Sequence, residues 1–388
     1  MNILYLAHDL DDSAIWRRVS MLERGGARVR VMGFRRGEGA LPGPAELLGQ
    51  TENGKMVARI GAVLRILPGI GARVATEAAP DVIVARNLEM LALAVATGRR
   101  LAHVPIVYEL LDIHRLMLGR GLIARTLRRV EAYLMRRSAL VILSSPGFER
   151  AYLDAYRQPQ IPRLLVENKP LLPEGVAAPA RPARLTPASP SRLTIAWYGI
   201  LRCAWSLDML DRMTRMQPGR YRVLLRGKPA LDAVPRFHEI VARNPDLEFH
   251  GPYRWPDDLA AIYGETDFTW LIDRYDAAAN SDWLLPNRLY EGALYGAVPI
   301  ALRGTEVAAR LEALGLGLIA PAPEGAAGLL ARIDAPRLAE LRRAVAAQPI
   351  DTWLADTKAC RALTARLSAL PRGPRHPHHP LAQKGTVA

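Results

Sequence analysis

Cysteines, aromatic residues and long apolar runs are all scarce in this sequence, and each shortage excludes a class of protein. The two cysteines among 388 residues, Cys203 and Cys360, are far apart, fit no metal-ligand spacing and are expected to be reduced core residues. An aromatic content of 6% argues against stacking on single-stranded nucleic acid. Every apolar run is shorter than the roughly 18 residues of a membrane-spanning helix, and no secretory signal follows Met1. We therefore expect a cytoplasmic protein.

Basic residues are in excess and are concentrated in the N-terminal half. The formal net charge is +14, and most of the excess of Lys and Arg falls within residues 1–185. Such a distribution suits an anionic partner, either phospholipid headgroups or nucleic acid. The alternative is that the positive charge reflects only the general richness of the chain in Arg and Ala and serves no binding partner. A peripheral position on the inner face of the plasma membrane is therefore one of the expectations that the charge leaves open.

Strand and helix signals alternate along the chain in two separate series. Short apolar segments, such as residues 3–6 and 105–109, alternate with amphipathic stretches, and the alternation restarts at residue 194. Strands that are apolar on both faces predict parallel sheets covered by helices, which is an α/β class of fold. We predict two Rossmann-like domains and divide the chain into an N-terminal domain 1–170, a proline-rich linker 171–192, a C-terminal domain 193–345, C-terminal helices 346–370 and a disordered tail 371–388.

The segment Lys55–Val74 carries Arg59, Arg65 and Arg73 among apolar residues. One interpretation is an amphipathic helix that lies on an anionic membrane. The other is a helix packed on the sheet with its arginines in water.

The most informative segment is Ser281–Ile300, in which Pro-Asn-Arg-Leu-Tyr-Glu ends at Glu291 and is followed by a small-residue helix and Gly-Ala-Val-Pro-Ile. This order resembles the donor site of GT-B glycosyltransferases, in particular their family-four-like members. The resemblance implies a GT-B fold, with two Rossmann-like domains whose parallel sheets face each other across a cleft. It also implies a nucleotide-sugar donor that is bound mainly by the C-terminal domain.

The resemblance assigns roles to several residues of this segment. Glu291 would accept hydrogen bonds from the two ribose hydroxyls of the donor. An ionised carboxylate has two acceptor oxygens and no donor, and their spacing matches two neighbouring hydroxyls. Asn287 would cap the helix that follows, and Arg288 stands where the family usually has lysine. Many members have a second glutamate eight residues before the first, facing the transferred sugar. Here that position is Trp283, so its neighbour Asp282 is the candidate replacement.

Two glycine turns upstream resemble the segments in which the backbone of the family approaches the donor diphosphate. Gly199 ends one apolar strand, and Arg226 and Lys228 flank the glycine that ends the next. Arg202, Arg226 and Lys228 are the candidate cations for the diphosphate leaving group. Because fixed cations do the work of a divalent metal, we expect neither a metal nor a cofactor. Tyr253, in a loop that resembles the nucleobase loop of the family, is either a stacking residue or a core tyrosine.

Candidates on the acceptor side follow an apolar strand of the N-terminal half, where α/β sheets place ligand groups. Asp112 and His114 lie in a segment similar to the acidic and histidine segment of the family, which faces the sugar and the acceptor. Either would deprotonate the acceptor hydroxyl in an inverting enzyme, whereas in a retaining enzyme His114 would only orient the sugar. The alternative for Asp112 is capping of the next helix.

The loop after the first strand contains an Asp-x-Asp string, Asp9 and Asp11, of the kind that holds a metal in the other large class of glycosyltransferases. Its position near the N-terminus favours a loop on the acceptor side, in which Asp12 or Ser13 caps a helix. We therefore predict no metal site there.

The resemblance covers nearly the whole chain in layout, with its specific motifs in residues 195–303. The N-terminal half is similar to bacterial transferases that build exopolysaccharide or succinoglycan, which implies transfer of a sugar to a glycan acceptor on a polyprenyl diphosphate. No nucleic acid is expected as a partner. Two alternatives stay open: a non-hydrolysing nucleotide-sugar epimerase of the same fold, and a basic nucleic-acid-binding α/β protein. A dehydrogenase is disfavoured, because no Gly-x-Gly-x-x-Gly follows the first strand.

Overall fold

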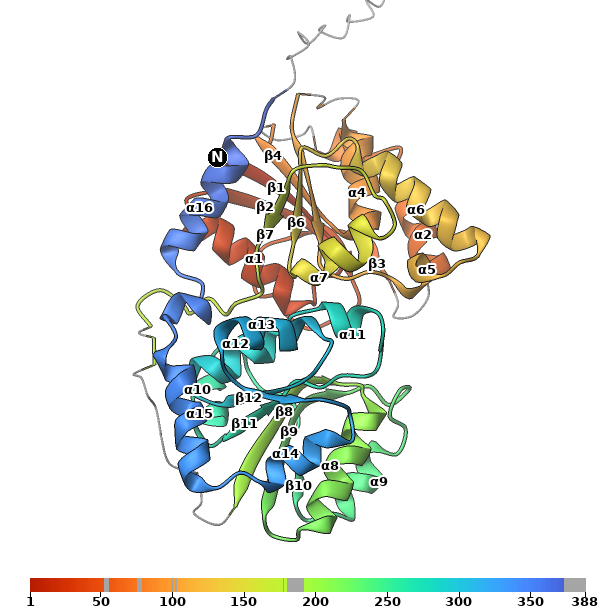
Figure 1. The fold of residues 1–388 in the computed structure, drawn as a ribbon. Helices are drawn as coiled ribbons and strands as arrows, with labels where there is room; N and C mark the ends of the chain where they lie inside the picture. Colours follow the sequence, from red (N-terminus) through yellow and green to blue (C-terminus); the bar gives the residue numbers. More distant parts are fainter. Residues whose placement is uncertain are drawn as a thin grey trace, which may run out of the picture.

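The computed structural model describes residues 1–51, 56–74, 79–98, 101, 103–176, 178–179 and 192–372. These residues form two α/β domains that lie one above the other (Figure 1). Within them, each domain has one sheet, and every strand pair is parallel. The predicted α/β class with two Rossmann-like domains is confirmed.

The N-terminal domain is built on a sheet with the strand order β3-β2-β1-β4-β5-β6-β7. Its strands are β1 (Asn2–Ala7), β2 (Arg28–Arg35), β3 (Glu46–Gln50), β4 (Val82–Arg86), β5 (Ile106–Leu110), β6 (Leu140–Leu143) and β7 (Arg163–Leu165). Its helices are α1 (Ser13–Arg24), α2 (Met56–Ile66), α3 (Ile70–Val74), α4 (Asn87–Thr97), α5 (Arg115–Leu118), α6 (Leu122–Met135), α7 (Pro146–Phe148) and a π-helical turn (Glu149–Asp154).

The C-terminal domain is built on a sheet with the strand order β10-β9-β8-β11-β12-β13. Its strands are β8 (Leu193–Leu201), β9 (Tyr221–Pro229), β10 (Leu247–Phe249), β11 (Phe268–Trp270), β12 (Val298–Leu302) and β13 (Leu318–Ala320). Its helices are α8 (Ala204–Met216), α9 (Phe237–Ala242), α10 (Leu259–Gly264), α11 (Asn280–Trp283), α12 (Asn287–Leu294), α13 (Glu306–Leu314), α14 (Gly325–Ala331) and α15 (Ala335–Ala347).

The last helix, α16 (Thr357–Ser368), returns to the N-terminal domain and lies beside α1 (Figure 1). It follows a short 3-10 helix, Ile350–Thr352. The hydroxyl of Thr364 donates a hydrogen bond of 2.8 Å to the carbonyl oxygen of Gly25 at the end of α1. Leu363 is buried in the cluster that holds α1 against the sheet. Helices were predicted for residues 346–370, but only the structure shows that the last of them ties the two domains together.

Alternating side chains on β1 divide the N-terminal core into two layers. Leu4 and Leu6 belong to the cluster that contains residues of α4 and α6. Ile3 and Tyr5 belong to the cluster that contains residues of α1 and α16. Because successive side chains of a strand point to opposite faces, an apolar strand requires helices on both sides. The sheet is covered in this way, as the sequence pattern predicted.

The structure has no single helix across Lys55–Val74. The helix breaks at residues 67–69, because Pro68 has no N–H to continue the ladder and a glycine follows it. Val63 and Ile70 are buried in the N-terminal core, whereas Arg65 and Arg73 are exposed. The described part of these helices therefore packs on the domain with its arginines in water. Lys55 itself lies outside the described residues.

The predicted linker begins slightly inside the packed domain, since Leu171 and Leu172 are buried. Most of the remaining linker, and the chain after residue 372, fall outside the described residues. Within the described residues, we find no helix that is both long enough and apolar enough to cross a bilayer.

Candidate active site

Two glycine turns meet at the carboxyl end of the C-terminal sheet. Gly199 on β8 is paired with Gly227 on β9, and their φ angles are 109° and 118°. A Cβ on Gly227 would lie 1.9 Å from the carbonyl oxygen of Gly199, so a side chain does not fit there. A Cβ on Gly199 would meet no described atom within 4 Å. The backbone at Gly199 is therefore open to a ligand.

Arg202 and Arg288 both lie near Asp273, just beyond these turns. The Nε of Arg202 is 3.2 Å from a carboxylate oxygen of Asp273, and its guanidinium is 4.9 Å from the centre of the Tyr275 ring. Arg288 donates from Nε to the carbonyl oxygen of Trp270 at 3.0 Å. Burial lowers the pKa of Arg288, and the charge of Asp273 opposes that shift. Two fixed guanidinium groups therefore lie at the edge of the sheet where the glycines leave space.

The other two predicted cations lie on either side of Gly227. Arg226 is 3.9 Å from a carboxylate oxygen of Glu265, and Lys228 is exposed. Of the four basic side chains, Arg202 also affects the N-terminal domain, since burial raises the pKa of Asp112 and the charge of Arg202 opposes that shift. Arg202 thus lies within the electrostatic reach of a residue of the N-terminal domain.

Helix α12 begins at Asn287, and Pro286 occupies its N-cap position without a side-chain capping bond. The predicted cap by Asn287 is therefore wrong. A capping residue precedes the helix in an extended conformation, and Pro286 has that conformation, with φ −73° and ψ 148°. Since proline has no side-chain acceptor, the first N–H groups of α12 have no side-chain cap and retain their affinity for anions.

Glu291 is buried at the boundary between the two domains, with 2% of its surface exposed. One of its carboxylate oxygens accepts a hydrogen bond of 3.1 Å from the indole N–H of Trp255. The other accepts one of 3.3 Å from the hydroxyl of Tyr263. Burial raises the pKa of Glu291, and the charge of Arg17 opposes this shift. The carboxylate is thus held as a two-oxygen acceptor by two donors of the C-terminal domain, while Arg17 of the N-terminal domain favours its charged form.

Sequence reasoning missed Arg17 and Trp255. The guanidinium of Arg17, from α1, lies 4.6 Å from the centre of the Trp255 ring, which joins the N-terminal domain to the loop beside Glu291. Tyr253, predicted in the same loop, is half-buried with its ring 6.1 Å from that of Tyr198. Trp255 lies two residues beyond Tyr253, in the loop that resembles the nucleobase loop of the family. This closeness in sequence is the one feature from which its place at the site could have been predicted. Nothing in an amphipathic helix marks Arg17 as a buried residue.

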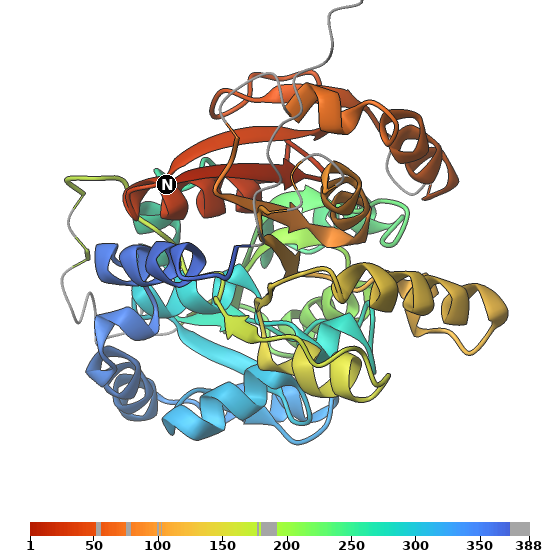
Figure 2. The same ribbon diagram turned by 90° about the horizontal axis from the view of Figure 1, so that it is seen from above.

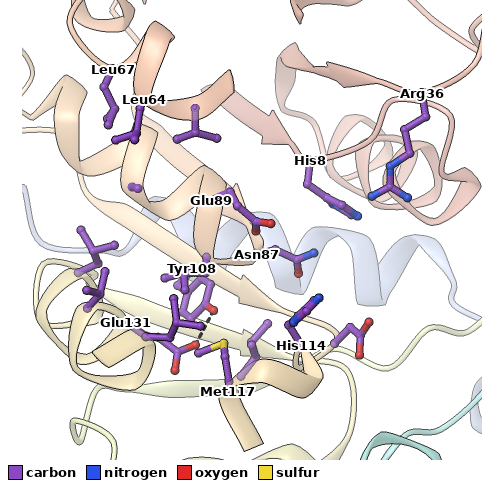
Figure 3. Close-up of a pocket in the computed structure, with 18 of the residues that line it drawn as sticks. His8, Arg36, Leu64, Leu67, Asn87, Glu89, Tyr108, His114, Met117 and Glu131 are labelled. Atoms are coloured by element: carbon purple, nitrogen blue, oxygen red, sulfur yellow. Dashed lines mark hydrogen bonds between the residues drawn. The ribbon is translucent and has the colours of Figure 1, made fainter. Parts of the chain in front are cut away.

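Asp112 and His114 lie in the loop between β5 and α5, facing a cavity of about 630 Å³ (Figure 3). His8, Arg36 and Asn87 line the same polar side of the cavity, and Tyr275 of the C-terminal domain also lines it. Burial raises the pKa of Asp112, although Arg202 offsets part of the shift. The structure thus brings both predicted acceptor-side residues to one cavity.

The helix after this loop is capped by His114 rather than by Asp112. The Nδ1 atom of His114 accepts a hydrogen bond of 3.2 Å from the backbone N–H of Leu116 in α5. The alternative of a capping role for Asp112 is therefore wrong. His114 is held by its cap in a defined orientation at the cavity, which suits a residue that orients a sugar.

Asn280, at the start of α11, holds the Asp112 loop against the C-terminal domain. Its side-chain N–H donates to the carbonyl oxygen of Ile113 at 2.7 Å, and its side-chain oxygen accepts from the N–H of Ile113 at 3.3 Å. Nearby, Arg115 forms an ion pair with Asp276 and stacks on Tyr275. These contacts hold the loop that carries Asp112 and His114 against the C-terminal domain.

We expect Asn280→Ala to lower the melting temperature. The substitution leaves the buried N–H and carbonyl of Ile113 without their partner, at a cost of about 1–3 kcal/mol. Thermal unfolding followed by circular dichroism measures the effect, with Ser368→Ala on the exposed side of α16 as the control. Equal melting temperatures for Asn280→Ala and the control would show that the interdomain bond contributes nothing.

The remaining predicted acidic residues are bound by nearby backbone and side chains, Asp282 within its own loop and Asp9 and Asp11 by residues that follow β2. Asp282 accepts a hydrogen bond of 2.7 Å from the N–H of Ala278, and burial raises its pKa. Asp9 pairs with Arg36 at 3.2 Å, and Asp11 accepts from the N–H of Gly37. Asp12 caps α1, as predicted. Among the residues that the structure describes, no group of acidic, histidine and cysteine side chains is arranged to hold a metal ion.

Comparison with known proteins agrees with this geometry. Residues 7–169 match the family described as glycosyl transferase 4-like domain. The succinoglycan biosynthesis protein ExoL of Rhizobium meliloti is 41% identical over 383 residues, which cover 95% of this chain and 94% of that protein. Sucrose-phosphate synthase of Thermosynechococcus elongatus superposes with a TM-score of 0.70 at 15% identity, over 95% and 98% of the two chains. HepE of Anabaena, in complex with UDP-glucose, superposes with a TM-score of 0.63 at 17% identity, over 94% and 98%.

The fold and the site define a glycosyltransferase of the GT-B class. The chain belongs to the glycosyl transferase 4-like family, and its similarity to ExoL extends over nearly its whole length. The predicted fold and enzyme class are confirmed. The comparisons give no support to the epimerase or to the nucleic-acid-binding alternative.

Proposed function

We propose that this protein transfers a sugar from a UDP-sugar to a lipid-linked glycan during exopolysaccharide assembly, on the cytoplasmic face of an anionic membrane and without a metal or cofactor. One observation carries the proposal. Glu291, the Gly199 turn and Arg202 lie at one edge of the C-terminal sheet. Asp112 of the other domain is close enough to Arg202 for the arginine charge to act on its pKa.

On the donor side, each part of a nucleotide sugar has a matching group. The ribose diol is bound by the two carboxylate oxygens of Glu291, in place of the N–H and O–H that they accept from Trp255 and Tyr263. The diphosphate lies along the open backbone at Gly199, with Arg202 and Arg288 beside it. These fixed cations stabilise the negative charge that develops on the leaving diphosphate.

On the acceptor side, Asp112 is the residue best suited to take a proton. Burial raises its pKa, which makes its carboxylate a stronger base than an ordinary aspartate. His114 binds the sugar hydroxyls in the orientation that its cap on α5 defines.

The names of the similar proteins support the choice of substrates. ExoL is a succinoglycan biosynthesis protein, which supports a polysaccharide acceptor. HepE was solved with UDP and with UDP-glucose, which supports uridine as the base of the donor. The charge of the N-terminal half supports an anionic membrane as the place where the acceptor is met.

A thermal-shift series tests the donor part of the proposal. UDP, GDP, ADP and dTDP are each added in EDTA and again with Mg²⁺. A ligand at 100 times its dissociation constant stabilises the fold by about 2.7 kcal/mol. We expect UDP to raise the melting temperature in EDTA. Stabilisation by another diphosphate alone would overturn the choice of uridine, and stabilisation by UDP only with Mg²⁺ would overturn the metal-independent site.

A further inference from the structure

The reaction cavity adjoins a second, larger cavity between helices of the N-terminal domain. The second cavity has a volume of about 1400 Å³. Both are lined by a shared set of residues: Leu64, Leu67, Ala92, Val130 and Leu134. We call the second cavity the helix groove, and it lies between α2 and α3 on one side, α4 at its base and α6 on the other side. The helix groove therefore lies directly beside the cavity at Asp112 and His114.

Polarity changes along this path. The end at the active site carries His8, Asn87 and His114, whereas Leu64 and Leu67 lie on the opposite side of the cavity (Figure 3). Among the described residues that line the helix groove, Arg137 is the sole charged one. The two cavities together match an amphipathic molecule, with a polar head at the catalytic groups and an apolar chain between the helices.

The rim of the helix groove exposes large apolar side chains. Leu64 is 59% exposed, Val130 44% and Tyr133 55%. At the free end of α6, Leu122 is 79% and Ile123 69% exposed. Single exposed apolar residues are ordinary, but a group of them around one groove marks a surface that is covered in use.

The charge of α6 indicates what covers it. Residues 122–137 contain five arginines, Arg125, Arg128, Arg129, Arg136 and Arg137, and a single carboxylate, Glu131. Glu131 is buried and accepts hydrogen bonds from Tyr108 and Tyr152, so it does not offset the arginines at the surface. The helix projects from the side of the domain away from α16 (Figures 1 and 2). Apolar side chains among arginines are the pattern of a helix that lies on an anionic bilayer.

We infer that the helix groove holds the hydrocarbon chain of the lipid that carries the acceptor, while the basic edge of α6 contacts the anionic bilayer from which the lipid extends. The inference rests on the proposed function and adds to it the place where the lipid binds. It explains why an apolar groove lies beside a polar reaction cavity, since a bilayer lipid keeps its chain in apolar surroundings as its head reaches Asp112.

Photolabelling tests the groove directly. The probe is n-dodecyl β-D-glucoside with a diazirine at the far end of the alkyl chain, and labelled peptides are identified by mass spectrometry. We expect labels on α4 and α6, and we expect Ala96→Trp, which fills the groove from α4, to reduce labelling at least about fivefold. Ala365→Trp on the exposed side of α16 is the matched control. Labels spread over the surface, or equal labelling of both variants, would overturn the inference.

Vesicle binding tests the basic edge. In co-sedimentation with phosphatidylglycerol vesicles, Arg129→Glu with Arg136→Glu should weaken binding at least about tenfold, since each arginine near an anionic surface contributes. Arg361→Glu with Arg366→Glu makes the same charge change on α16 and should have a small effect. Equal losses of vesicle binding in the two double variants would contradict membrane contact through α6. Binding of single-stranded DNA instead of vesicles would contradict it as well. The UDP-induced shift in melting temperature should be unchanged in the two tryptophan variants and in the two double arginine variants. A failure of the lipid-binding inference is therefore distinguishable from a failure of the donor-site proposal.

Discussion

Glu291→Gln should weaken UDP binding about 100-fold while the protein stays folded. Two hydrogen bonds from the ribose hydroxyls to an ionised carboxylate contribute about 1.5–3 kcal/mol each, and each 1.4 kcal/mol is tenfold in affinity. The amide keeps one acceptor, has no charge and presents an N–H₂ where the second hydroxyl must donate. The variant has nearly the same shape, so the packing around Trp255 and Tyr263 is retained. Isothermal titration with UDP measures the loss.

The stability of the same variant provides an independent check. Burial raises the pKa of Glu291, which means that its charge is costly in the folded state. Removing the charge should therefore leave the melting temperature equal or slightly higher. Glu312→Gln, on the exposed side of α13, is the matched control and should bind UDP normally. The ribose assignment fails if the UDP affinities of the two variants agree within about threefold.

Arg202→Ala should lower kcat about 100- to 1000-fold, because the loss of one fixed donor at a developing anion has an effect of that size. Arg202 lies between Asp273 and the Tyr275 ring, so its guanidinium is held in place before the reaction. Arg202→Lys keeps the positive charge but lacks the planar guanidinium group with its fixed N–H donors, and it should recover part of the rate. The donor dissociation constant should change much less than kcat. Arg212→Ala, on the exposed side of α8, is the control for loss of an arginine nearby.

The pH profile distinguishes this role from a purely structural one. The charge of Arg202 lowers the pKa of Asp112, so removing it raises that pKa further. If Asp112 is the base, it must be deprotonated to act, and the rising limb of the activity profile should move to higher pH in Arg202→Ala. An unmoved limb would mean that Asp112 does not take the proton, even if kcat falls.

The placement of the candidate donor residues could largely be predicted because they lie in continuous segments. Gly199 and Gly227 lie near the carboxyl ends of the apolar strands β8 and β9, and Glu291 lies in the helix α12 that the motif predicted. Parallel strands bring their carboxyl ends to one edge of a sheet. Local rules failed where a residue one or two positions away took the expected role. Pro286, not Asn287, occupies the cap of α12, and His114, not Asp112, caps α5.

The amino-acid sequence by itself determined two parallel α/β domains, a donor motif ending at Glu291 and the position of the acceptor-side loop, because strand periodicity and short motifs are local properties. Only the tertiary structure decided that Arg17 lies over Trp255, that Asn280 bonds to Ile113 from 167 residues away, and that helices of the N-terminal domain enclose an apolar groove. These contacts join segments far apart in the chain. Their partners are set by how α1, α11 and α16 pack across the two domains, and that packing depends on the shapes of whole buried surfaces rather than on any one stretch of sequence.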